Sequence, residues 1–206
     1  MCTHHNHAFC KYFEDRSPVR LDELHYRDLM GDIVPNNTPG QKTTKLPFRD
    51  WAPLIPSVKY VTTRGNTMKF FVPNKYNGWE TYIQFPQWFE QVNDESLTAP
   101  EAARLLLWSG DVKLHCHCPS FTFWGFNYIL DQMDASIYHE DRYPNIRNPN
   151  LKGIACKHLI RTLKVLPFHL ADMAGVIKAQ RLRGADVEIK PQFDIPAIPV
   201  AEPQVA

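Results

Sequence analysis

The sequence predicts an α+β fold, in which a small antiparallel sheet packs with helices and extended arms flank this core. Short β-branched and aromatic runs lie between residues 58 and 85, separated by turn signals, and helical patterns follow at 99–108 and after residue 154. The chain of 206 residues is 44% hydrophobic, which suits one core and not two full domains. Its 17 prolines against 9 glycines indicate much stiff, irregular chain.

Three strands are expected in the sheet. Residues 58–63 and 68–72 are separated by Arg64-Gly65-Asn66, a pattern typical of a hairpin with glycine in its turn. The run 79–85 alternates apolar and polar positions, which predicts a sheet with one mainly buried face. The positions expected on the buried face are Trp79, Thr81, Ile83 and Phe85, and those on the other face are Glu80, Tyr82 and Gln84.

The clearest helix is predicted over residues 99–108. Thr98 stands at the N-cap position, Glu101 follows three residues later as in a capping box, and Gly110 comes after the end. Residues 86–93 are expected to add one or two helical turns, and a strand is expected to enter the cysteine pair that follows Gly110.

Two more helices are expected near the end of the core. The first has apolar residues on one face, Pro167 interrupts it, and a further helix ends at Gly184. The apolar positions of the first are Ile154, Leu159, Leu163 and Leu166.

Proline-rich stretches divide the chain into a core and two arms. Residues 1–48 are expected to form an extended N-terminal arm, with at most a short helix at 18–30. Residues 49–185 form the predicted core, and 186–206 form a proline-rich C-terminal tail. The arms are expected to bind neighbouring subunits, including copies of this chain in a symmetric assembly.

Charge and hydropathy argue against several classes of function. The 23 basic and 22 acidic residues give a net charge of +1, so a bulk attraction to nucleic acid or membrane is missing. We expect neither a membrane span nor a secretory signal, and therefore synthesis in the cytoplasm. Phosphate-binding loops, nucleophile elbows and dinucleotide fingerprints are missing from the sequence, so an enzyme is not expected.

Four Cys and His residues have the spacing of a metal site. Cys116 and Cys118 form C-x-C, and Cys156 and His158 form C-x-H after 37 intervening residues. In a reducing compartment, clustered Cys and His indicate metal before disulfide. Two thiolate or imidazole pairs suit a closed tetrahedral Zn²⁺ site, so we expect Zn²⁺ as the cofactor.

Other uses of this segment stay open. In an extended chain His117 points away from its two cysteine neighbours, so His115 and His117 are less favoured as ligands. The cysteines can instead be ordinary core residues. A catalytic zinc with Glu140 or Asp141 as base is a further alternative, disfavoured because four ligands leave no open position and no H-x-E or H-E-x-x-H pattern occurs.

The order strand, C-x-C, long insertion, C-x-H, helix resembles the SWIM-type zinc finger over residues 111–166. Cys116, Cys118, Cys156 and His158 match its four ligand positions, although an insertion of 37 residues is long for this motif. The segments EAARLLLWSGDVKLHCHCPSF and YPNIRNPNLKGIACKHLIRTLKVLPFH are similar to small virion structural proteins of tailed bacteriophages. The resemblance implies a zinc-stabilised component of the tail, baseplate or head-to-tail region. DNA binding stays open, because such fingers are associated with both DNA and protein contacts.

A basic cluster in the last third of the chain is the candidate for DNA contacts. Lys157, Arg161 and Lys164 are the residues that we expect to touch phosphate if DNA is bound. The favoured alternative is that these charges are solvated helix faces. The wider cluster also includes Lys152, Lys178, Arg181 and Arg183.

The N-terminus and the aromatic residues supply the last candidates. A second metal site is conceivable at Cys2, His4, His5, His7 and Cys10, against the alternative of a terminus with no specific role. The aromatic residues are expected in the core rather than in base stacking. They are Phe121, Phe123, Trp124, Phe126 and Tyr128, with Trp51, Trp79, Trp88 and Trp108 interpreted in the same way.

Overall fold

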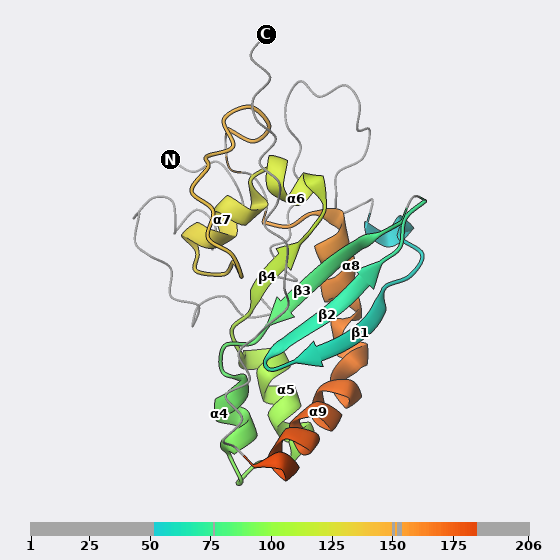
Figure 1. The fold of residues 1–206 in the computed structure, drawn as a ribbon, viewed down its shortest axis with the longest axis vertical. Helices are drawn as coiled ribbons and strands as arrows, with labels where there is room; N and C mark the ends of the chain where they lie inside the picture. Colours follow the sequence, from blue (N-terminus) through green and yellow to red (C-terminus); the bar gives the residue numbers. More distant parts are fainter. Residues whose placement is uncertain (1–51, 76, 150, 152–153, 185–206) are drawn as a thin grey trace.

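The computed structural model describes residues 52–75, 77–149, 151 and 154–184 (Figure 1). Its architecture is α+β, as predicted, with one antiparallel sheet and helices packed on and around it. The arms 1–48 and 186–206, the helix expected at 18–30 and the possible second metal site at Cys2, His4, His7 and Cys10 lie outside the described residues.

The sheet has four strands in the order β1-β2-β3-β4, and every neighbouring pair is antiparallel. The three strands expected between residues 58 and 85 and the strand expected before the cysteine pair are confirmed. Gly65 turns the β1–β2 hairpin with φ of 55°. The strands are β1 (Lys59–Arg64), β2 (Thr67–Val72), β3 (Trp79–Gln84) and β4 (Lys113–Cys116).

The helices form three groups around the sheet (Figure 1). Helix α8 packs against β2, β3 and β4, helices α4, α5 and α9 pack together at one end, and α6 and α7 lie at the other. Their bounds are η2 (Ala52–Leu54), α4 (Trp88–Asn93), α5 (Ala99–Ser109), α6 (Pro119–Phe123), α7 (Phe126–Gln132), α8 (Lys157–Val165), η3 (Leu166–His169) and α9 (Leu170–Arg183).

Local sequence signals account for the helix boundaries. The backbone N–H of Thr98 donates to Glu101 Oε2 at 2.8 Å, which completes the capping box that starts α5. The N–H of Gly110 closes the other end on the carbonyl of Leu105 at 3.1 Å. Pro167 ends the regular turns of α8 and begins η3, as its missing N–H requires.

Both faces of the sheet are covered near β3 and β4, contrary to the expectation for the polar face of β3. The core face carries Met68, Phe70 and Ile83, all fully buried with α8 behind them. On the opposite face, Tyr82 and its β4 partner His115 are buried as well. The cause is the segment between β4 and α8, which returns across this face and places Tyr138 and Phe121 against the ring of His115.

Two of the aromatic residues expected in the core are exposed. Phe123 is 60% exposed and Trp108 is 46% exposed, so for these residues the prediction was wrong. Phe121, Phe126 and Trp88 are buried, as expected. The difference arises because each exposed ring occupies the outer side of a helix whose inner side is already filled by other aromatic or leucine side chains.

The C-terminal helix α9 is tied to distant parts of the fold by two side chains. Gln180 accepts from Trp88 Nε1 at 2.6 Å and donates to the carbonyl of Gly65 at 3.1 Å, which joins α9 to α4 and to the hairpin turn. The guanidinium of Arg181 donates four hydrogen bonds of 2.7–2.9 Å to the chain between α4 and α5. Its acceptors are the carbonyls of Gln91, Val92, Asp94 and Leu97.

Two glycines offer a matched test of local packing. Gly125 has φ of 69°, and a Cβ there would lie 2.3 Å from Pro144 Cγ, whereas a Cβ at Gly175 in α9 would meet nothing within 4 Å. We expect Gly125→Ala to lower the free energy of unfolding by about 1–3 kcal/mol through strain and displacement of Pro144. Gly175→Ala should raise it by about 0.5–1 kcal/mol through helix propensity. Urea unfolding of both variants measures these changes, and equal changes in the free energy of unfolding would contradict the prediction.

Candidate metal centre

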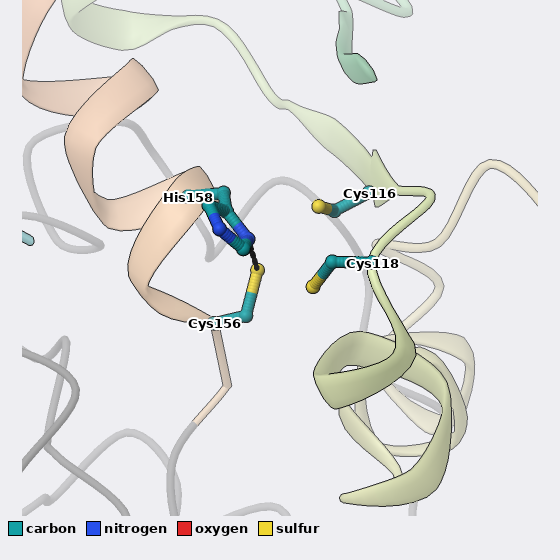
Figure 2. A group of neighbouring side chains, drawn as sticks. All are labelled: Cys116, Cys118, Cys156 and His158. Carbon is teal, nitrogen blue, oxygen red and sulfur yellow. Dashed lines mark hydrogen bonds between the residues drawn. The ribbon is translucent and has the colours of Figure 1, made fainter. Parts of the chain in front are cut away.

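Three cysteines and one histidine meet between the end of β4 and the start of α8 (Figure 2). Their ligand atoms, three Sγ and one imidazole nitrogen, all lie within 4.8 Å of one another. All four residues are buried. The structure therefore brings together all four of the ligands predicted from the sequence, Cys116, Cys118, Cys156 and His158, across the 37-residue insertion.

Local structure positions each half of this cluster. Cys116 ends β4, and Cys118 is the N-cap of α6, where its Sγ accepts a hydrogen bond from the N–H of Phe121 at 3.4 Å. Cys156 is the N-cap of α8, so His158 falls in the first turn of that helix. As in an extended segment, Cys116 and Cys118 turn their side chains to the same side (Figure 2).

A buried pair of threonines fixes β3 and α8 beside the cluster. Thr81 is the direct β3 partner of Cys116. Its Oγ1 lies 2.9 Å from Oγ1 of Thr162 in α8, and Thr162 Oγ1 also donates to the carbonyl of His158 at 2.9 Å. This contact was not foreseen, because it depends on the strand register and on the rotation of α8. The sequence gives no signal for this contact apart from two threonines at otherwise apolar positions.

Burial and mutual hydrogen bonds shift the pKa values of the three thiols. Burial raises the pKa of Cys116 and of Cys118 well above the usual thiol range. Burial acts in the same direction on Cys156, but hydrogen bonds from the other two thiols and from His158 outweigh it and hold the pKa of Cys156 well below that range. Its Sγ lies 3.9 Å from His158 Nδ1. A bound dication would compensate the negative charge that these cysteines carry as thiolate ligands.

The donor set fits a tetrahedral metal ion. Bonds of about 2.3 Å from zinc to sulfur place neighbouring sulfurs roughly 3.8 Å apart. The ligand atoms here all lie within 4.8 Å of one another, so small shifts bring them to that spacing. Among the residues that the structure describes, no Asp or Glu joins the group. Three soft thiolates with one imidazole favour zinc or another thiophilic ion over Mg²⁺ or Ca²⁺. The cluster can therefore bind a metal ion.

The neighbouring histidines lie on the other side of β4. His115 is packed against Phe121 and Tyr138, with ring centroids at 5.4 and 4.7 Å. Burial lowers the pKa of His115 to about 3, so this ring is neutral. His117 lies 3.6 Å from Glu80. Neither histidine belongs to the group of ligand atoms, in agreement with the alternation expected for an extended strand.

Of the two carboxylates considered as catalytic bases, one is paired with an arginine and the other is exposed. Glu140 is buried and accepts from Arg142 Nε at 2.6 Å and from Nη2 at 2.5 Å. Although burial opposes it, this bidentate pairing holds the pKa of Glu140 below its usual range. Asp141 is exposed.

The candidate DNA contacts Lys157, Arg161 and Lys164 fall on one face of α8, four and three residues apart, and all are half-buried. Other members of the basic cluster do not extend this face: Lys178 is exposed on α9, and Arg181 is engaged by backbone carbonyls. Lys152 lies outside the described residues.

The chain matches no protein-family model, no curated protein and no solved structure. In the part of the chain that the structure describes, each helix is too short or too polar to cross a membrane.

Proposed function

We propose that Cys116, Cys118, Cys156 and His158 bind one Zn²⁺ ion in a closed structural site. The observation that carries this proposal is the convergence of four buried thiol and imidazole ligands at the junction of β4, α6 and α8. Four protein ligands complete a tetrahedral shell, which is the pattern of structural zinc, whereas catalytic zinc keeps a position for water.

The position of the cluster explains what the ion would do. Helix α8 covers the sheet, but the chain joining it to β4 is long, and its α6–α7 part packs at one end of the molecule (Figure 1). A zinc ion would cross-link the strand end Cys116 to the helix start Cys156 and so close this loop. The zinc would then add folding free energy, on the order of 10 kcal/mol, to that of the hydrophobic core.

We further propose that the chain is a structural protein of a tailed-phage virion, made in the host cytoplasm, that contacts other virion proteins and copies of itself. The support is the similarity of residues 101–121 and 143–169 to such proteins, together with long proline-rich segments at both ends of the sequence. Extended segments commonly add to the surfaces of neighbouring subunits. A closed site without a carboxylate agrees with a structural role rather than hydrolysis.

Mass spectrometry of purified particles tests the virion assignment. We expect the chain to remain with particles through density-gradient banding and high-salt washing, at a constant ratio to the other particle proteins. Recovery only in the soluble fraction of the lysate would contradict it. This experiment is independent of metal content, so the two parts of the proposal can fail separately.

A second candidate function is DNA binding through α8, favoured by the common face of Lys157, Arg161 and Lys164. If three phosphates are neutralised, the logarithm of affinity should fall with the logarithm of salt with a slope of about −2.7. Lys157→Ala and Lys164→Ala should each reduce the slope by about 1, while the control Lys178→Ala on α9 leaves it unchanged. Filter binding or fluorescence anisotropy measures this, and an absence of binding at low salt excludes the function.

A further inference from the structure

The segment between Cys118 and Cys156 forms an exposed groove that lies outside the candidate metal site. Its volume is about 440 Å³, and it lies between α6 and the segment 140–147. The side chains that give it its character are Phe123, Tyr143 and Ile146, which are apolar or aromatic, and Arg142 and Arg147, which are cationic.

The walls of this groove are held in place by the fold. Pro144 lies directly against Gly125, where even one added carbon would lie 2.3 Å away. The hydroxyl of Tyr143 donates to the carbonyl of Pro149 at 2.7 Å, and its ring packs edge-on against Tyr128 at 5.5 Å. Asn148 donates to the carbonyl of Trp124 at 3.0 Å. A groove fixed in this way binds an extended segment without a large ordering cost.

The same groove exposes more apolar surface than an isolated domain needs. Ile146 is 90% exposed and Phe123 is 60% exposed, although both border the groove. The only acidic residue in the lining, Glu140, is already bound by Arg142. The groove thus offers aromatic and aliphatic contacts, and with Arg142, Arg147 and Glu140 in its lining it carries one net positive charge. Such a lining suits an apolar, acidic and extended ligand.

The C-terminal sequence has these properties. Residues 186–206 contain Pro196 and Pro199 in a P-x-x-P arrangement, with isoleucines at 195 and 198. Proline-rich segments of this kind bind aromatic grooves as polyproline II helices, because proline lowers the entropy lost on binding. The segment has four acidic residues and a single basic one, Lys190; the acids are Asp186, Glu188, Asp194 and Glu202.

We propose that the groove lined by Phe123, Tyr143 and Ile146 binds the C-terminal tail, residues 186–206, of a second copy of this chain. The inference rests on the proposed role as an assembly component and names the contact through which copies would join. Charge complementarity favours this acidic segment over a basic one. The exposed apolar side chains and the fixed walls suit its isoleucines and prolines.

Distance favours a second copy over the chain's own tail. Helix α9 ends at the opposite end of the molecule from α6, which forms one wall of the groove (Figure 1). A domain of this size has a radius of gyration of roughly 14 Å, which corresponds to a sphere of roughly 18 Å radius with a path of roughly 57 Å half-way around it. Pro196 lies 12 positions after Gly184, and a polyproline II chain of that length covers only roughly 37 Å.

Sedimentation of the full-length chain with bound zinc tests the proposal. We expect self-association that depends on concentration, weakens with salt and is inhibited by a synthetic peptide of residues 186–206. A peptide of the same composition in scrambled order should not compete. Phe123→Ser with Ile146→Ser, and separately Ile195→Ser with Ile198→Ser, should each weaken association at least about tenfold. The control Phe168→Ser changes a side chain that is 83% exposed on η3 and should have no effect.

Mixing the groove variant with the tail variant gives the decisive result. Each alone has lost one side of the contact, but together they retain one intact groove and one intact tail, so a heterodimer should form. A wild-type chain that stays monomeric at millimolar concentration, or association that neither pair of substitutions weakens, would overturn the proposal. Zinc content measured on the same samples separates this result from failure of the metal site.

Discussion

Loss of the metal is expected to abolish cooperative unfolding of the domain. Chelation, or Cys156→Ser, would remove the proposed zinc cross-link between β4 and α8 and leave Cys116 and Cys118 as buried thiols without a cation. Structural zinc contributes on the order of 10 kcal/mol to folding. Since whole domains are stable by only about 5–15 kcal/mol, most of the net stability should disappear. Thermal unfolding followed by circular dichroism, with metal content measured on the same protein, checks this.

The C-x-C segment itself supplies the control. His117→Ala lies between two of the ligands but points to the opposite side of the strand, toward Glu80. It should leave the metal content unchanged and shift the melting temperature only by what the contacts of His117 with Glu80, Tyr82 and His115 contribute. A Cys156→Ser protein that melts cooperatively at the wild-type temperature would contradict a structural site.

Arg181→Ala is expected to destabilise the domain strongly, although this residue lies on the last turn of a helix. One guanidinium serves four carbonyls of the α4–α5 connection, and truncation leaves all four to find other donors. We expect a loss of about 2–4 kcal/mol in the free energy of unfolding, since hydrogen bonds to charged groups are worth about twice neutral ones. Arg181→Lys should recover only a small part, because an ammonium cannot reproduce the planar fork.

Arg183→Ala is the matched control for this prediction. Arg183 lies two residues after Arg181 in the last turn of α9 and is exposed. Its removal should change the free energy of unfolding by less than about 0.5 kcal/mol. Equal effects of the two substitutions in urea unfolding would show that the four carbonyls are satisfied equally well by water.

Much of the core could be predicted because its signals are local. Alternation identified β3, Gly65 identified the hairpin, and the Thr98–Glu101 capping box identified the start of α5. The four ligands were predictable for the same reason: each pair is short, and its spacing alone carries the chemistry.

The remainder depends on contacts between residues far apart in the sequence. Burial of His115 requires Tyr138 to return across the sheet, and the Thr81–Thr162 contact requires a particular register between β3 and α8. The acceptors of Arg181 lie 84 to 90 positions away. A basic residue near a helix end gives no sign of such a role, which is why a solvated face was the expected interpretation.

The metal content of the purified full-length chain, measured together with its native mass, tests the central claim most directly. The account predicts one zinc ion per chain, lost together with the folded state in Cys156→Ser. Two ions per chain would add a site, for which Cys2, His4, His7 and Cys10 are the candidates, and would leave the first intact. A folded chain without bound metal after purification in zinc-containing medium would contradict the claim and make Cys116, Cys118 and Cys156 ordinary buried thiols.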